Sequence, residues 1–111
     1  MISFDDFLKV EMRVGKVLTV KDFDKARKPA YQLWIDFGAE LGIKKTSAQI
    51  THNYTKEALI GKLVIAVTNF PPKQIANFMS EVLVLGASDS AGHIVLLSPE
   101  KEGVTIGERI H

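Results

Sequence analysis

Residues 69–86 read NFPPKQIANFMSEVLVLG, and this stretch constrains the fold more than any other part of the chain. Pro71 and Pro72 have no backbone N–H to donate, so the loop that contains them cannot continue the strand before it. A short amphipathic stretch, a serine and an apolar strand follow. Two interpretations remain open. The loop is either a plain crossing at the end of a barrel or a stiff rim that presents Asn69, Lys73, Gln74, Asn77 and Ser80.

Three strands are expected before this stretch, over residues 12–23, 31–37 and 43–50. The second strand alternates most clearly between apolar and polar residues. One face carries Tyr31, Leu33, Ile35 and Phe37, and the other carries Gln32, Trp34 and Asp36. Gly15 interrupts the first strand and predicts a bulge or a sharp curve there. Gly38 and Gly42 bracket an expected turn before the third strand.

The remaining elements are shorter. Residues 51–60 are the only central stretch with helical character, and the expected strands after it cover residues 62–69, 81–86, 93–97 and 104–110. At the N-terminus, Ser3 followed by Asp6 predicts a capping arrangement that opens a short helix. A helix of this length is not stable alone, so it is expected to dock onto another surface.

Three strands, a small helix and two more strands, with glycines at points of curvature, match the five-stranded Greek-key barrel called the OB-fold. The predicted fold class is therefore all-β, an OB barrel with a short N-terminal helix and extra C-terminal strands. An SH3-like or other small β-barrel is the main alternative. With 111 residues, the chain is expected to form one domain over residues 1–111.

Several classes of site find no support in the sequence. The chain has no cysteine, which excludes a disulfide framework and a thiolate metal site. His52, His93 and His111 are scattered along the chain, so no metal ligation is expected. No phosphate-binding loop, dinucleotide fingerprint or nucleophile elbow occurs, so we expect neither a cofactor nor an enzyme.

The sequence also bears on the location of the protein in the cell. The longest apolar runs are too short to cross a bilayer, so no membrane insertion is expected. The N-terminal region carries Asp5 and Asp6 rather than basic residues followed by an apolar stretch, so no signal peptide is visible. A cytoplasmic location is the default expectation.

The charge is unevenly distributed along the chain. Residues 25–80 contain eight Lys or Arg and three acids, although the whole chain has a net charge of only +1. OB-folds bind their ligands on strands 2–3 and on loops 1–2 and 4–5. Loop 1–2 is the basic DKARKPA of residues 24–30, and loop 4–5 falls within residues 69–80. The positive charge therefore falls where this fold binds ligands.

Six cations are candidate contacts to nucleic-acid phosphates: Lys25, Arg27, Lys28, Lys44, Lys45 and Lys73. Such contacts release counterions and give affinity that depends on salt and not on sequence. Arg27 is the one that can bind a phosphate bidentately. The alternative is that these residues form an ordinary solvated surface.

Apolar residues point to a second kind of surface. Trp34 has polar neighbours on its strand, so it is expected to face outward, either to stack on a base or to be covered by a partner subunit. Strands 62–69 and 81–86 are apolar on both faces, which is more than one small barrel can bury. A homodimer is the simplest way to cover the excess. The candidate dimer or peptide-binding surface comprises Phe4, Phe7, Trp34, Phe78 and Met79.

Three segments resemble the signatures of one family. VEMRVGKV at residues 10–17, TSAQI at residues 46–50 and the stretch 69–86 are similar to the tRNA-binding OB domain. That domain is appended to some methionyl- and phenylalanyl-tRNA synthetases and also occurs alone. SAQIT, NFPP and SEVLVLG, in this order, resemble its CsaA branch of bacterial and archaeal proteins, which are described as export-related chaperones. The family core would span about residues 8–111.

The resemblance implies a homodimer that recognises tRNA by shape. It places Lys73 at the family's first basic position after the prolines, Ser80 at its rim serine and Asn69 at its strand-ending asparagine. The resemblance therefore adds Asn69 and Ser80 to the six cations as candidate RNA-binding residues. Gln74, Asn77 and Leu83 depart from the pattern of the tRNA-binding branch. The expected function is a non-catalytic, CsaA-like tRNA-binding protein with an export-related chaperone role. The alternative is a chaperone that holds unfolded or precursor polypeptides on an apolar dimer surface, with RNA binding weak or lost.

Overall fold

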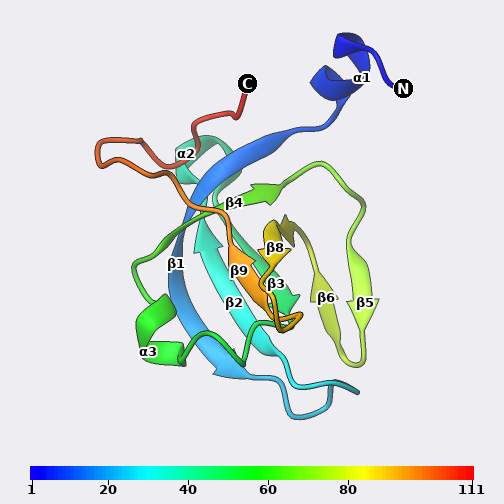
Figure 1. The fold of residues 1–111 in the computed structure, drawn as a ribbon, viewed down its shortest axis with the longest axis vertical. Coiled ribbons are helices and arrows are strands. Elements are labelled where there is room, and N and C mark those ends of the chain that lie inside the picture. The colour runs from blue at the N-terminus through cyan, green and yellow to red at the C-terminus, as the bar shows by residue number, and fades with distance from the viewer.

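The computed structural model describes residues 1–111, and its centre is a nearly closed five-stranded barrel (Figure 1). The strands are β1 (Met12–Asp22), β2 (Tyr31–Asp36), β3 (Ile43–Ala48), β4 (Leu63–Val67) and β7 (Leu83–Val84). They pair antiparallel in the order β3-β2-β1-β4-β7. The predicted all-β barrel with a short N-terminal helix and extra strands is therefore confirmed.

Shorter elements surround the barrel. The helices are α1 (Phe4–Lys9), α2 (Gly38–Leu41) and α3 (Lys56–Leu59), and two hairpins pair β5 (Lys73–Ile75) with β6 (Phe78–Ser80) and β8 (Gly86–Ser88) with β9 (Ile94–Leu96). The expected helical character of residues 51–60 is confined to α3, which is capped by the Thr55 hydroxyl. The turn between glycines 38 and 42 is the single helical turn α2. No helix has the length and apolar character needed to cross a membrane.

The core confirms the alternation predicted for the second strand. Tyr31, Leu33, Ile35 and Phe37 are all buried. They pack with side chains from β1, β4, α3, β9 and the segments next to β3 and β7, namely Val17, Ile50, Leu59, Val64, Ala66, Val82 and Leu96. Because successive residues of a strand point to opposite faces, the residues between them lie on the outer face of β2. This outer face carries Trp34.

Gly15 does not mark a bulge. The register between β1 and β2 shifts between Val17 and Thr19 instead. Gly15 lies where the core approaches the backbone of β1 most closely, because a Cβ there would be 2.5 Å from Cγ2 of Ile35 and 2.6 Å from Cε1 of Phe37. The glycine is needed because it leaves room for these two buried side chains.

The stretch 69–86 is more structured than predicted. Between its prolines and Ser80 it forms the β5–β6 hairpin, which turns at Ala76 with a positive φ of 53°. The strand expected over residues 81–86 shrinks to the two residues of β7, after which the chain enters β8. The polar rim predicted from the sequence is therefore the arm of a hairpin and not an irregular loop.

The strand expected over residues 104–110 is wrong. This segment runs beside β1 but forms only one isolated bridge, between Arg13 and Arg109. Its backbone still donates from Gly107 N to Val14 O at 2.7 Å and from Ile110 N to Met12 O at 2.9 Å. Gly107 has a φ of +90°, a left-handed conformation that interrupts an extended strand.

Helix α1 extends away from the barrel (Figure 1) and has no buried residue. Its predicted capping box is present, with Ser3 Oγ accepting from Asp6 N and an Asp6 carboxylate oxygen accepting from Ser3 N. These bonds, with Lys9, lower the pKa of Asp6. Within this chain the helix does not dock onto the core, so the surface that it is expected to dock onto is not in this chain. Its apolar side chains are left for another surface.

Candidate nucleic-acid interface

A small second cluster of buried side chains fixes the position of the basic loop. Phe23 and Ala30, at the two ends of the loop between β1 and β2, pack against Phe78 of β6. The rings of Phe23 and Phe78 lie 5.5 Å apart, and Phe23 N donates to Ala30 O at 3.1 Å. The loop 24–30 and the β5–β6 hairpin, nearly fifty residues apart in sequence, are therefore held against each other.

Between these anchors the loop exposes its cations. Lys25, Arg27 and Lys28 are all exposed, as the sequence predicted. Arg27 and Lys28 line a shallow cavity of about 370 Å³. Lys56 of α3 binds Asp22 at 2.8 Å, which raises the pKa of Lys56 and offsets an acid beside the loop. The loop therefore presents three cations from a fixed base.

Trp34 lies at the centre of the neighbouring outer face, where it is half-buried. Its ring meets the Phe78 ring edge-to-face, with centroids 5.8 Å apart and planes at 81°. Lys21 Nζ lies 5.2 Å from the Trp34 ring centroid, and Lys45 Nζ lies 5.4 Å from that of Phe78. The tryptophan therefore faces outward, as predicted, and cations flank the aromatic pair.

Lys21 was missed by the sequence analysis, although the strand pattern contains the signal for it. Lys21 pairs with Gln32, and Thr19 pairs with Trp34, which puts Lys21 on the same outer face. The register shift within β1 hides this relation in a simple count along the strand, because one extra residue reverses which side chains face outward.

Lys44 and Lys45 do not act together. In β3 they are adjacent and therefore point to opposite faces. Lys45 pairs with Trp34 on the outer face, whereas Lys44 pairs with the core residue Ile35 and lies on the inner side of the sheet, partly buried. Only Lys45 therefore lies beside Trp34, and a phosphate contact of Lys44 stays a prediction.

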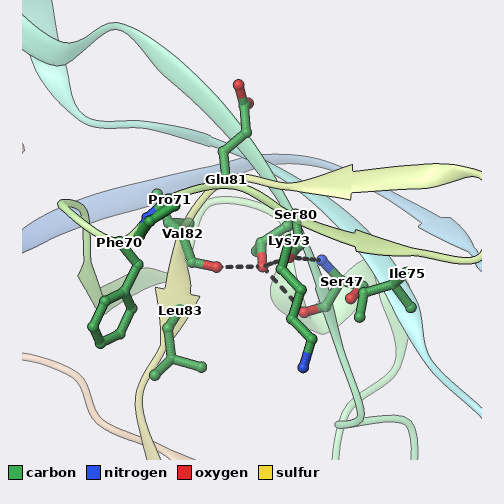
Figure 2. Close-up of a pocket in the computed structure, with 10 residues that line it drawn as sticks. Ser47, Phe70, Pro71, Lys73, Ile75, Ser80, Glu81, Val82 and Leu83 are labelled. Carbon is green, nitrogen blue, oxygen red and sulfur yellow. Dashed lines mark hydrogen bonds between the residues drawn. The ribbon is translucent and has the colours of Figure 1, made fainter.

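Ser80 belongs to the framework of the site. Its hydroxyl accepts a hydrogen bond from Ser47 N at 3.1 Å and lies 2.7 Å from the hydroxyl of buried Thr46, which donates to Val82 O (Figure 2). These bonds join the hairpin to β3 where the barrel is not closed by backbone pairing. The Ser80 hydroxyl therefore has a structural role within the chain, and its contact with RNA stays a prediction.

Asn69 is also used within the protein. Its side chain donates to Lys9 O at 2.8 Å and accepts from Glu11 N at 2.9 Å, so both polar atoms hold the segment that joins α1 to β1. Asn69 therefore has a structural role within the chain, and its contact with RNA stays a prediction. Apart from Lys44, the predicted cations are Lys25, Arg27, Lys28, Lys45 and Lys73. Lys21 joins them.

The residues predicted for a dimer or peptide surface differ in how far they are exposed. Phe78 is only 8% exposed and is buried under the basic loop, so it is not available as a surface residue. Phe4 is 72% exposed on α1, and Phe7 is partly buried beside it with ring centroids 6.3 Å apart. Met79 is 42% exposed on β6. Trp34, as described above, is half-buried on the outer face.

A groove opens between the hairpin, β3 and β7, with a volume of about 450 Å³ (Figure 2). Apolar side chains line much of it, including Phe70, which is 50% exposed, and Leu83. Lys73 contributes a cation to the same groove. Together with the cations near Trp34, this gives the molecule a basic surface and an adjoining apolar one.

The chain is similar to known proteins in both sequence and structure. The sequence matches the family described as "Putative tRNA binding domain" over residues 12–109. Among solved structures, the CsaA chaperone protein from Picrophilus torridus has a TM-score of 0.93 and 55% sequence identity, with 100% of both chains covered. The chaperone CsaA from Bacillus anthracis strain Ames has a TM-score of 0.92 and 51% identity, covering 100% of this chain and 99% of the other.

Longer relatives share only part of their length with this chain. The methionine–tRNA ligase of Thermococcus onnurineus (strain NA1) is 34% identical over 109 residues, which are 98% of this chain but 14% of the ligase. The family that these proteins share with the chain is a tRNA-binding domain and not a catalytic one.

Proposed function

Because this chain belongs to the tRNA-binding domain family, on the branch that contains the CsaA structures, we propose that it is a non-catalytic protein that binds folded tRNA by shape and phosphate contacts. The observation that carries the proposal is the packing of the basic loop against the β5–β6 hairpin. This packing holds the loop that carries Lys25, Arg27 and Lys28 against the hairpin that carries Lys73. Lys21 and Lys45 flank the Trp34–Phe78 pair beside it. The cytoplasm, where tRNA is found, is the location that follows from this function.

The geometry favours phosphates over base edges as the main contacts. Lysines and arginine on exposed positions attract the RNA backbone without reading its sequence. RNA helices are recognised mostly through their shape and backbone, because their deep major groove excludes side chains. The loop and hairpin have a fixed relative position, so their cations can match the spacing of phosphates on a folded RNA.

We expect a folded tRNA to bind more tightly than a single-stranded RNA of similar length, with affinity that falls steeply as salt rises. A fluorescence-anisotropy titration of both RNAs at several salt concentrations measures this. The slope of log affinity against log salt gives the number of phosphates engaged, at about 0.7–0.9 per contact. Binding that is insensitive to salt, or equal for the two RNAs, would contradict the proposal.

A second candidate function is holding unfolded or precursor polypeptides, as in an export-related chaperone, on an apolar surface of a homodimer. The apolar groove beside Phe70 and Leu83 favours it, and so does the apolar face of α1, which nothing in this chain covers. Phe4 and Leu8, both exposed on α1, are the side chains that a second copy of the chain would cover.

Replacing both residues, in Phe4→Ser with Leu8→Ser, is expected to convert a dimer to a monomer and to abolish suppression of a client's aggregation. Sedimentation velocity measures the first effect, and light scattering of a heat-denatured client enzyme in moderate salt measures the second. Ile60→Ser, which removes a similarly exposed apolar side chain outside α1 and the groove, is the control. A variant that remains dimeric would exclude α1 as the dimer contact, and undiminished suppression would exclude a dimer-surface chaperone.

A further inference from the structure

Next to the basic loop lies a separate cavity of about 470 Å³, and Lys28 is the one predicted RNA-contacting residue that lines it. Its volume falls within the range of small-molecule sites, roughly 300–1,000 Å³. The lining comes from three segments, namely Lys28 and Pro29 of the basic loop, residues 49–53 after β3, and residues 92–94, which lead into β9. Lys28 also lines the neighbouring cavity beside Arg27, so this cavity continues from the basic surface.

Two histidines that are far apart in the sequence meet in this cavity. The rings of His52 and His93 are stacked with centroids 3.5 Å apart and planes within 13°. The sequence analysis treated them as scattered, because 41 residues separate them. His52 is exposed, whereas His93 lies beneath it, partly buried. One face of the His52 ring therefore rests on His93, and its other side is turned toward solvent.

The segments that carry the two rings are clamped together. Asn53 donates to Asp89 Oδ2 and to Ile94 O, both at 3.1 Å. Asp89 Oδ1 accepts from Ala91 N at 2.9 Å and from His93 N at 3.0 Å. The Asn53 bond, followed by the backbone bond from His93, lowers the pKa of Asp89, so the clamp persists in its charged form at neutral pH. The stacked pair is thus fixed from both sides.

The geometry of the His52–His93 stack is not the one that packing in a protein interior favours. Aromatic rings in protein interiors prefer offset or edge-to-face arrangements over a close face-to-face stack. In addition, His93 Nδ1 is buried without a hydrogen-bond partner, which costs stability and calls for an explanation. A metal ion bound by both histidines does not explain the stack. Parallel rings cannot direct their nitrogens at a single ion, and no third ligand residue joins them.

We propose that the His52–His93 stack is a platform on which an unpaired base of the bound RNA stacks, with Lys28 holding an adjacent phosphate. Aromatic faces accept any base, since every base has a π-face, and a nearby cation that follows the backbone is the usual companion of such a platform. The inference rests on the proposed tRNA-binding function and adds a second kind of contact to it. Folded tRNA supplies unpaired bases, whereas a fully paired duplex does not.

The test uses the full chain with an in vitro transcribed tRNA and a blunt RNA duplex, titrated by anisotropy at several salt concentrations. His52→Ala is expected to weaken tRNA binding about five- to 150-fold while leaving the salt slope and duplex binding unchanged. His52→Phe, which keeps an aromatic face, is expected to bind like the unmodified chain. Lys28→Ala should instead lower the salt slope by about 0.7–0.9. His111→Ala, an exposed histidine outside the cavity, is the control.

The possible outcomes separate this inference from the function on which it rests. If the unmodified chain binds tRNA and His52→Ala binds equally well, the stacking platform is refuted and the tRNA-binding function stands. Equal loss in His52→Ala and His52→Phe also refutes stacking, because an aromatic face is then insufficient. If the unmodified chain binds neither RNA, the tRNA-binding function fails and the platform fails with it. Urea unfolding midpoints equal to that of the unmodified chain show that each variant is folded.

Discussion

Reversing the three charges of the basic loop, with Lys25→Glu, Arg27→Glu and Lys28→Glu together, is expected to weaken tRNA binding on the order of a hundredfold at moderate salt. Each residue contributes one candidate phosphate contact, so the slope of log affinity against log salt should also fall by about 2–3. Duplex RNA should lose affinity as well, because phosphate contacts do not depend on sequence. The titration described above measures both quantities.

The fold is expected to survive this triple change. The loop is held by the buried side chains of Phe23 and Ala30, which remain in place, while the three cations are exposed. Far-UV circular dichroism and a urea midpoint check this. The single tryptophan, Trp34, provides a further check on the neighbouring face, because its emission reports whether the packing against Phe78 is retained.

A matched comparison separates local contacts from net charge. Arg27→Glu with Lys28→Glu and Lys9→Glu with Lys101→Glu change the net charge equally. Lys9 and Lys101 are exposed and lie outside the basic loop, and the Lys9 contact with Asp6 is an exposed one of 3.4 Å, which is worth little. If both double variants lose the same affinity, the protein attracts RNA only through its overall charge and the proposed interface is wrong.

The largest expected effect on stability comes from Gly15→Ala. The added Cβ would lie within 3 Å of Ile35 and Phe37, both of which are almost completely buried. Neither side chain has free space to move into, so either β1 or the core must shift. Overpacking of this kind costs roughly 1–3 kcal/mol, which corresponds to a fall in Tm of roughly 5–20 °C for a domain of this size. Urea and thermal unfolding measure the change.

A double-mutant cycle identifies the cause. Phe37→Leu removes part of the ring that the new Cβ would meet, so the combination with Gly15→Ala is expected to cost less than the sum of the two single changes. A purely additive result would show that the cost of Gly15→Ala does not arise from contact with Phe37. An unchanged unfolding midpoint in Gly15→Ala itself would show that β1 moves without cost at this point.

Much of the fold could be predicted from local patterns. The alternation over residues 31–37 is confirmed residue by residue, and the N-terminal capping box forms as expected. The resemblance carried by the three motifs is confirmed by the family match over residues 12–109. Where the patterns were weak, the sequence misled. A strand was expected over residues 104–110, but Gly107 adopts a left-handed conformation that interrupts it.

The candidate site was less predictable. The cations of the basic loop are exposed as expected, because a short polar loop has few alternatives. Lys44 and Lys45 were grouped because they are neighbours in sequence, yet strand geometry sends them to opposite faces. Ser80 and Asn69 were placed among the candidate RNA-binding residues by the family resemblance. In the folded chain, backbone groups that would otherwise lack partners use their side chains.

Local sequence patterns were enough to predict the three long barrel strands β1, β2 and β3, the barrel class and the family, since these depend on residues within a few positions of one another. Which distant residues meet depends on the folded chain. It packs Phe23 against Phe78, which joins the basic loop to the hairpin, and it stacks His52 on His93. The direction of a side chain is set locally by the period of its strand. Contacts between segments depend instead on how the barrel closes, on the register shift in β1 and on the hydrogen bonds that hold the loops together.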